Sequence, residues 1–163
     1  MNIEYRKFEE KSEMYGYIHE NLRLIGEECN DITAVLANAS ALLMLELDDI
    51  NWAGFYLMKN GELVLGPFQG KPAVVKITVG SGVCGTAVEQ RLTQLVDDVH
   101  SCCNHIACDL ATSSEIVVPI FVNGEIYGVI DIDSPVYSRF DNEDKAGLEK
   151  FAEIIAKLTA NAR

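Results

Sequence analysis

Apolar positions in the first third of the chain recur at steps of three and four residues, the spacing of one helix face. The first such stripe contains Phe8, Tyr15, Ile18, Leu22 and Ile25. The second follows Asn30 and Asp31, which can cap a helix, and contains Ile32, Val35, Leu36, Ala39, Leu42 and Leu43. The pattern therefore predicts two consecutive helices.

The period then changes to two, the spacing of a strand. Over 51–58, one face carries Ala53, Phe55 and Leu57, and the other carries Trp52, Gly54, Tyr56 and Met58. Asn60-Gly61 and Val122-Asn123-Gly124 are tight-turn sequences, which predict hairpins between 51–58 and 62–68 and between 115–121 and 125–133. Shorter strands are expected at 74–79 and 94–96, and a short helix at about 84–90.

The end of the chain predicts one more helix. Asp141 begins it, and Asp144 three residues later resembles a capping box. Its apolar stripe is Leu148, Phe151, Ile154, Ile155 and Leu158. Helices at both ends of a mostly antiparallel sheet make an α+β fold. We expect the terminal helices on one sheet face, and the long irregular segment 97–114 over the other, where it closes a pocket.

Composition narrows the class of protein. The 163 residues are enough for a single domain over 1–163 with its own core. A net charge of −12 argues against nucleic acid or an anionic membrane surface as the partner. No stretch reads as a signal peptide or a membrane span, and the five cysteines are an odd number, so we expect reduced thiols in the cytoplasm.

Carboxylates on a strand provide the first candidate chemistry. Alternation places Asp131 and Asp133 on one face with Val129 and Tyr127, while the opposite face carries Ile126, Gly128, Ile130 and Ile132. Glu115, at the start of the adjoining strand, can approach the same place. Three converging carboxylates raise one another's pKa, so one can stay protonated and donate a proton. The alternative is that both aspartates face solvent at a strand end.

Two cysteines are further candidates. Cys108, in the string HIACD, is either a nucleophile or a buried, inert thiol. Cys84 follows Gly80-Ser81-Gly82, where backbone N–H groups can bind an anion and lower a thiol pKa; alternatively, these glycines only supply positive φ angles. Trp52 and Tyr56 either wall a pocket or belong to the core.

A Cys/His cluster allows a metal alternative. His100, Cys102, Cys103, His105 and Cys108 are possible zinc ligands, but their spacing matches no usual zinc pattern. We therefore expect no metal in this cluster.

Longer strings decide among these alternatives. In order, they are NWAGFYL at 51–57, LVLGPFQGKPA at 63–73, GSGVCGTA at 80–87, LVDDVH at 95–100, HIACD at 105–109, SEIVVPI at 114–120, GVIDIDSP at 128–135 and RFD at 139–141. This series resembles the free methionine-(R)-sulfoxide reductases, which are single GAF-domain enzymes. The resemblance covers about residues 12–158.

The resemblance implies a six-stranded sheet with the pocket on the side opposite the terminal helices, and a homodimer. It implies an enzyme that reduces free L-methionine-(R)-sulfoxide through a cysteine sulfenic acid, is recycled by thioredoxin or another thiol, and needs no metal or organic cofactor. Cys108 matches the nucleophile and Cys84 a second active-site cysteine. The acidic pocket residues match Glu115, Asp131 and Asp133, and the aromatic wall matches Trp52 and Tyr56. The alternative is a GAF module that senses a small ligand without catalysis.

One position departs from the family pattern. The cysteine that usually resolves the oxidised nucleophile is replaced here by Val74. Cys84 is the first candidate for that role, Cys102 and Cys103 are the next, and direct reduction by an external thiol is a third route.

Overall fold

The computed structural model describes residues 5–101 and 111–162. Six strands form one sheet in the order β3-β2-β1-β6-β5-β4, and every neighbouring pair is antiparallel. In chain order the elements are α1 (Lys11–Glu28), α2 (Ile32–Glu46), β1 (Trp52–Lys59), β2 (Glu62–Gln69), β3 (Lys76–Thr78), α3 (Gly82–Gln90), β4 (Gln94–Val96), the 3₁₀ helix η1 (Val99–Ser101), β5 (Ser114–Val122), β6 (Glu125–Ser134) and α4 (Asn142–Asn161).

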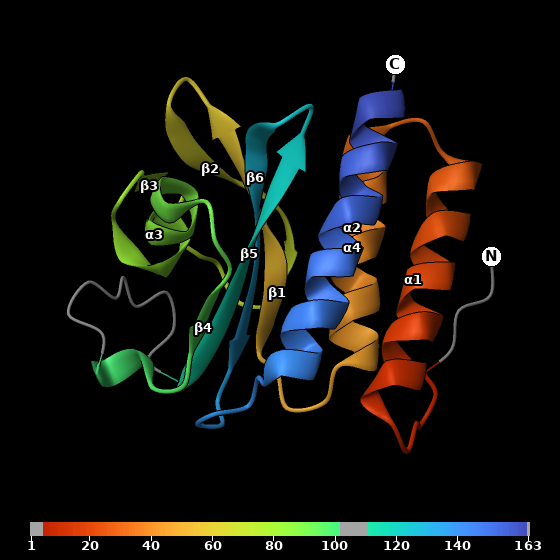
Figure 1. Cartoon of the computed structure of the whole chain (residues 1–163), viewed down its shortest axis with the longest axis horizontal. Coiled ribbons are helices and arrows are strands. Elements are labelled where there is room, and N and C mark those ends of the chain that lie inside the picture. Colours follow the sequence, from red (N-terminus) through yellow and green to blue (C-terminus); the bar gives the residue numbers. More distant parts are fainter. Residues whose placement is uncertain (1–4, 102–110, 163) are drawn as a thin grey trace.

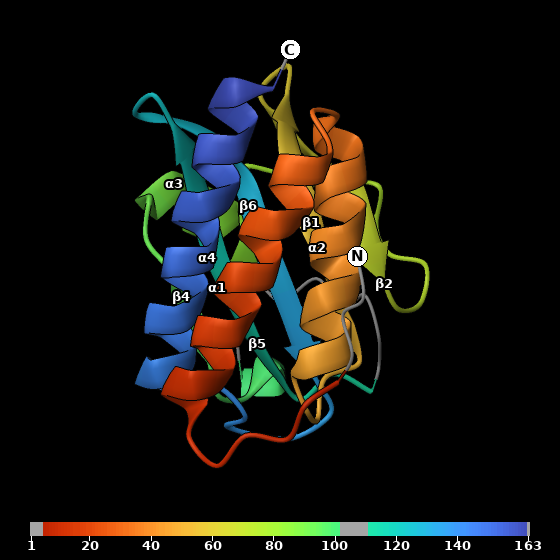
Figure 2. The ribbon, with the colours of Figure 1, turned by 90° about the vertical axis from the view of Figure 1, so that its right-hand side faces the viewer.

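The elements form layers (Figure 1). Helices α2 and α4 cover one face of the sheet, α1 lies outside them, and α3 lies on the other side of the sheet. Figure 2 shows the three long helices side by side in front of the strands. This arrangement confirms the α+β prediction and the position of the terminal helices. Within the described ranges, no helix is both long and apolar enough to cross a membrane.

The predicted helix stripes form the larger core, between the helices and the sheet. Their buried members include Ile18, Leu22, Leu36, Leu43 and Phe151, which pack with Ala53, Phe55, Ile130 and Ile132 of the sheet. Phe8 is the exception: α1 begins only at Lys11, and Phe8 packs on Tyr17. The strand predicted at 74–79 is shorter than expected, and the helix predicted from about residue 84 begins at Gly82.

Both predicted hairpin turns are confirmed. Asn60 and Gly61 have φ angles of 53° and 84°, and Asn123 and Gly124 have 52° and 81°. Two successive left-handed residues match the twist of the flanking strands, and asparagine and glycine adopt that conformation at least cost.

A bulge in β6 corrects part of the predicted alternation. Ile120 pairs with Gly128 but Phe121 pairs with Ile126, which leaves Tyr127 as an extra residue. Tyr127 therefore packs against the helix-side core, and Ile126 packs on the opposite side, the reverse of the prediction. The extra residue changes the phase of the side chains toward the hairpin. It leaves residues 129–133 in the predicted phase.

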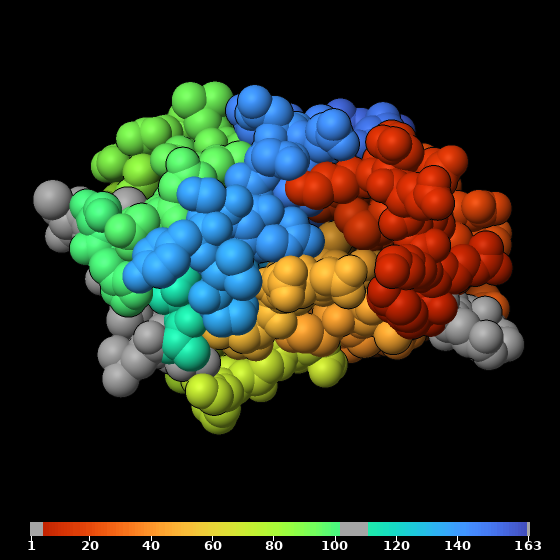
Figure 3. All heavy atoms as spheres, turned by 90° about the horizontal axis from the view of Figure 1, so that it is seen from below, coloured from red at the N-terminus to blue at the C-terminus, as the bar shows by residue number. Residues whose placement is uncertain are grey.

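Asp144 joins the N-terminal segment to α4. Its buried carboxylate accepts hydrogen bonds from Tyr15 Oη at 2.9 Å and from Arg139 Nη1 at 3.3 Å, and it forms an ion pair with Lys11 Nζ. With Asp141 it also forms the predicted capping box of α4. In Figure 3 the N-terminal segment (red) lies beside the segment that leads into α4 (blue), as these contacts require.

Two glycines allow α1 and α4 to approach closely. A Cβ added at Gly147 of α4 would lie 2.3 Å from Cγ of Tyr15, and a Cβ added at Gly26 of α1 would lie 2.3 Å from a methyl of Leu158. The ring of Tyr15 is buried and its hydroxyl is bonded to Asp144, so it has little freedom to move away. A side chain at position 147 would therefore force the helices apart.

We predict that Gly147→Ala lowers the free energy of unfolding by up to about 2 kcal/mol. Overpacking costs roughly 1–3 kcal/mol and outweighs the gain of about 1 kcal/mol from better helix propensity. Urea unfolding measures the difference. Gly16→Ala on α1 is the control, because nothing lies within 4 Å of its added Cβ, and it should stabilise by up to about 1 kcal/mol. Equal stabilisation by both variants would contradict the close contact.

Candidate active site

Sheet pairing brings the predicted carboxylates together on the face opposite the long helices. Asp133 of β6 pairs with Trp52 of β1 on one side and with Glu115 of β5 on the other. Asp131 lies two residues along the same strand, paired with Gly54 and Val117. Because directly opposed residues project to the same face, all of these side chains share one surface of the sheet.

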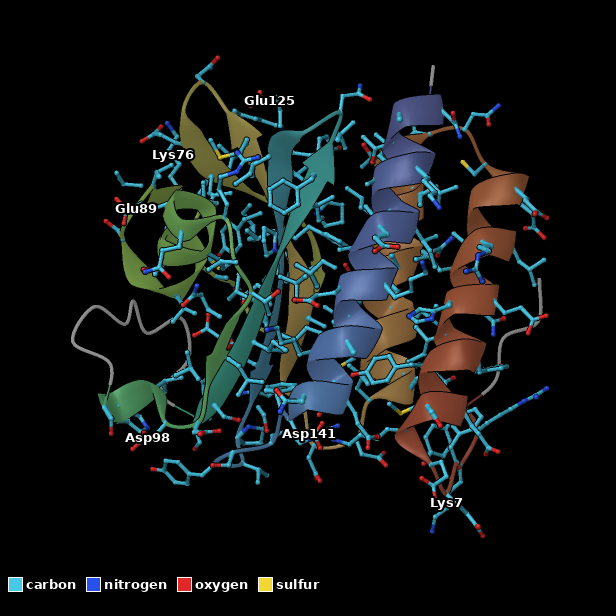
Figure 4. The ribbon with its side chains drawn as sticks, in the orientation of Figure 1. Lys7, Lys76, Glu89, Asp98, Glu125 and Asp141 are labelled. Carbon is cyan, nitrogen blue, oxygen red and sulfur yellow. The ribbon has the colours of Figure 1, made fainter. Side chains whose placement is uncertain are left out.

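The carboxylates are buried. Glu115, Asp131 and Asp133 are each 5% exposed. The charged residues labelled in Figure 4, among them Lys76, Glu89 and Glu125, lie instead at the periphery of the molecule. The alternative that the two aspartates face solvent at a strand end is therefore wrong.

Cys84 belongs to the same cluster. It lies in the first turn of α3, and its Sγ and one carboxylate oxygen each of Glu115 and Asp131 are within 4.8 Å of one another. Gly85 permits this position: a Cβ there would lie 2.4 Å from the carbonyl oxygen of Thr78, so α3 sits directly against the end of β3. The sheet and α3 thus each contribute to one group of ionisable side chains.

Burial changes the proton affinity of the two acids closest to Cys84. The pKa of Glu115 is raised well above its usual 4.5, first by desolvation and then by the negative charge of Asp133. The pKa of Asp131 is raised well above 3.8, first by desolvation and then by the charge of Glu115. Glu115 and Asp131 are also hydrogen-bonded to each other. A hydrogen bond between two carboxyl groups forms when one of them is protonated, and the raised pKa values of both groups favour that state.

The Cys84 thiol is held in its neutral form. Desolvation raises its pKa well above 9.0, and the charges of Asp131 and Glu115 raise it further. Desolvation and negative charge thus raise the pKa of Cys84 by more than the backbone N–H groups at the start of α3 could lower it. Gly80 and Gly82 do have positive φ angles, of 83° and 62°, so the conformational role of the glycines is confirmed.

Trp52 and Tyr56 form an aromatic layer beside the carboxylates. The Trp52 ring stacks on Tyr56 and on Phe68, with centroids 6.0 and 5.2 Å apart. Gly54 makes room for it, since a Cβ there would lie 2.8 Å from the indole ring. Trp52 Nε1 donates to the carbonyl of Lys71 at 3.1 Å, and Tyr56 Oη donates to the carbonyl of Val74 at 2.9 Å. The layer therefore also anchors the segment that carries Val74.

The remaining predicted site residues lie outside the cluster or outside the described part of the chain, and one residue of the aromatic layer was not predicted. Cys108, Cys102, Cys103 and His105 lie outside the described residues. His100 is exposed on η1, with its ring near Tyr137. Sequence reasoning missed Phe68, because simple alternation in 62–68 places it on the face opposite Leu63 and Leu65. One extra residue of β2 between the pairs Tyr56–Leu65 and Gly54–Phe68 brings it to their side.

Comparison with known proteins identifies the family of this site. The family model of the GAF domain matches residues 20–158. The free methionine-R-sulfoxide reductase of Escherichia coli is 49% identical over 150 residues, which cover 92% of this chain and 91% of that protein. The chain belongs to the free methionine-R-sulfoxide reductase family. This membership confirms the resemblance read from the sequence strings.

Solved structures of family members have the same fold. The Staphylococcus aureus fRMsr in complex with substrate is 52% identical, with a TM-score of 0.85 over 90% of this chain and 95% of that one. The Neisseria meningitidis free methionine-R-sulfoxide reductase in complex with its substrate is 37% identical, with a TM-score of 0.94 over 100% of this chain and 98% of that one. The buried carboxylates of this chain therefore lie in a reductase-family framework.

We predict that Asp131→Asn gains stability relative to the unmodified protein as the pH rises. Because the folded-state pKa of Asp131 is raised, its contribution to stability is complete below its unfolded pKa of 3.8 and is lost as the pH rises through the folded pKa. An amide does not titrate, and it can still donate a hydrogen bond to Glu115. Each unit of pKa shift corresponds to about 1.4 kcal/mol.

Urea unfolding at several values between about pH 4 and about pH 8 measures this effect. Glu125→Gln is the matched control, because it makes the same carboxylate-to-amide change at an exposed position of the same strand. The difference between Asp131→Asn and the unmodified protein should grow with pH, while the control difference should stay nearly flat. Parallel curves for both variants would mean that Asp131 is ionised in the folded protein.

Proposed function

We propose that this chain reduces free L-methionine-(R)-sulfoxide to L-methionine. The observation that carries the proposal is the cluster of Glu115, Asp131 and Asp133 beside the Trp52 ring, in which burial raises the pKa values of Glu115 and Asp131. Reduction of a sulfoxide needs a proton donor at the oxygen, and a buried carboxylic acid of raised pKa is such a donor. Membership of a family whose relatives carry that activity in their names supports the choice of substrate.

The first step is a two-electron exchange between two sulfur atoms. The Cys108 thiolate attacks the sulfoxide sulfur while Glu115 or Asp133 donates a hydrogen bond and then a proton to the oxygen. The attack forms a bond between Sγ of Cys108 and the substrate sulfur. The protonated oxygen then moves from the substrate sulfur to Sγ as the S–S bond and the substrate S–O bond break, so methionine leaves with its sulfur reduced by two electrons and Cys108 becomes a sulfenic acid. The proton that leaves the carboxyl group is replaced from solvent.

Binding follows from the charges of the free amino acid. The ionised carboxylate of the cluster suits the substrate ammonium, and Trp52 suits the S-methyl end. Backbone N–H groups near the glycine turn before α3 suit the substrate carboxylate. A pocket built for both charged ends disfavours methionine sulfoxide inside a polypeptide, because peptide bonds remove both charges.

The oxidised nucleophile must be reduced again after each turnover, and Val74 occupies the position of the family's usual resolving cysteine. We therefore assign the role of resolving cysteine to Cys84. Its thiol is buried beside Asp131 and hydrogen-bonded to it, so Asp131 can accept the thiol proton as sulfur attacks the sulfenic acid of Cys108. The proton passes to the departing hydroxyl group, which leaves as water, and a disulfide remains. Thioredoxin or a similar dithiol then reduces the disulfide. Cys102 and Cys103 are the alternative resolving residues.

The proposal includes the enzyme's cofactor requirement, oligomeric state and cellular location. No metal or organic cofactor is needed, because the electrons come from thiols. We propose a homodimer in the cytoplasm, supported by the resemblance and by the cysteine usage of the sequence.

A single-turnover experiment tests the reaction. Reduced protein is incubated with each epimer of free methionine sulfoxide, without thioredoxin, and the methionine released is measured. We expect about one methionine per chain from the R epimer, little from the S epimer, and none with Cys108→Ser, because each chain holds one nucleophile. Cys29→Ser is the control, as Cys29 lies at the end of α1, away from the cluster. No methionine from either epimer would favour the ligand-sensing alternative.

A second experiment tests the resolving residue. We predict that Cys84→Ser keeps the single turnover but loses at least about tenfold in steady-state rate with thioredoxin, because the sulfenic acid can no longer form a disulfide within the chain. Peptide mapping of the oxidised protein identifies the disulfide. A bond from Cys108 to Cys102 or Cys103, with full turnover in Cys84→Ser, would contradict the assignment.

A further inference from the structure

The cluster of Cys84, Glu115 and Asp131 has a property that sulfoxide reduction does not use. We propose that these three side chains form a binding site for a thiophilic divalent cation, with Zn²⁺ as the natural candidate, and that the metal inhibits the enzyme by occupying the substrate site. The second part rests on the proposed function. The first part rests on geometry alone.

The donor set suits zinc. One sulfur and two carboxylate oxygens are ligands that Zn²⁺ accepts, whereas Mg²⁺ and Ca²⁺ select oxygen only. The three donor atoms lie within 4.8 Å of one another. Tetrahedral zinc places such atoms about 3.4–3.6 Å apart, given bonds of about 2.3 Å to sulfur and about 2.1 Å to oxygen. Binding therefore requires only a small contraction of side chains that already converge, and a water can fill the fourth position.

The donors come from three separate elements of the fold. Glu115 is on β5, Asp131 on the central strand β6, and Cys84 in the first turn of α3. Neighbouring strands fix the two carboxylates in register, and the contact of Gly85 with Thr78 fixes the thiol. A site assembled from rigid elements is largely formed before the metal arrives.

Asp131 provides a second, independent observation. Its Oδ1 is fully buried and accepts no hydrogen bond from the part of the chain that the structure describes. A buried carboxylate oxygen without a partner is costly, and a cation that coordinates it removes that cost.

Zinc binding and substrate binding are then mutually exclusive. Zinc takes Cys84 as thiolate, so binding releases the thiol proton and the proton shared by the carboxyl pair. Both groups are thereby withdrawn from the reaction, the pair as proton donor and Cys84 as resolving thiol. Removal of the metal restores them, which makes the inhibition reversible.

Metal titration of the reduced, chelator-treated full chain tests the site. Zn²⁺ is titrated in competition with a chromophoric chelator, and Co²⁺ serves as a spectroscopic probe of thiolate ligation. We expect about one metal per chain and a sulfur-to-cobalt charge-transfer band. Asp131→Asn and Cys84→Ser should each weaken zinc binding by at least about tenfold, and Cys84→Ser should abolish the band.

The remaining cysteines are the competing explanation. A variant with Cys29, Cys102, Cys103 and Cys108 all changed to Ser keeps Cys84 as its one thiol, and it should retain both the metal and the band. Loss of zinc in this variant, with retention in Cys84→Ser, would overturn the proposal. If Cys84→Ser does not fold, as judged by circular dichroism, Asp131→Asn in the four-serine background gives the same decision.

Competition separates the two parts of the proposal. In Cys108→Ser, which cannot turn over and so keeps Cys84 reduced, saturating L-methionine-(R)-sulfoxide should weaken zinc binding by at least about tenfold if metal and substrate share the site. In the unmodified protein, zinc should stop methionine release until a chelator is added. Zinc binding that the sulfoxide does not change would overturn the inhibitory role. If the metal-free protein releases no methionine, the reductase proposal fails, while the titration still decides whether the metal site exists.

Discussion

Two carboxylates are held out of water because the isoleucines beside them must reach the core. Ile130 and Ile132 are fully buried beneath the long helices, and strand alternation then directs Asp131 and Asp133 to the other face of the central strand. That face is covered as well, so the carboxylates are desolvated together with Glu115. The raised pKa values of Glu115 and Asp131 and of the Cys84 thiol all follow from this arrangement.

Asp144 shows what a carboxylate in this protein does when its role is structural. It is as buried as the cluster acids, but it is surrounded by Lys11, Arg139 and the Tyr15 hydroxyl, and it caps α4. Asp144 thus has cations and a hydroxyl donor as its partners, whereas the pKa values of Glu115 and Asp131 are raised by desolvation and by other negative charges. A buried carboxylate therefore has a structural role at the start of α4. On the opposite side of the sheet, buried carboxylates with raised pKa values can donate and accept protons.

The aromatic layer connects this chemistry to a segment outside the sheet. Trp52 and Tyr56 pack in the core on this side of the sheet and donate hydrogen bonds to the carbonyls of Lys71 and Val74. These bonds hold the chain around position 74 against the aromatic layer. The segment is thus in place although the family's usual cysteine is missing from it. Cys84, fixed in α3 beside Asp131, is the thiol that we propose as the resolving cysteine in its place.

Local patterns were sufficient for most of the fold. The stripes of Ile18, Leu22 and Phe151 and the turns at Asn60 and Asn123 specify their elements because helix faces, strand faces and left-handed turns depend on neighbours only a few residues away. The bulge at Tyr127 depends on how β5 and β6 pair, so alternation within β6 alone gave the wrong side for Tyr127 and Ile126. The same limit applies to the site: the sequence identified Cys84, Glu115, Asp131 and Asp133, but their proton affinities were decided by tertiary structure. Desolvation and charge act between residues that only folding brings within a few ångströms.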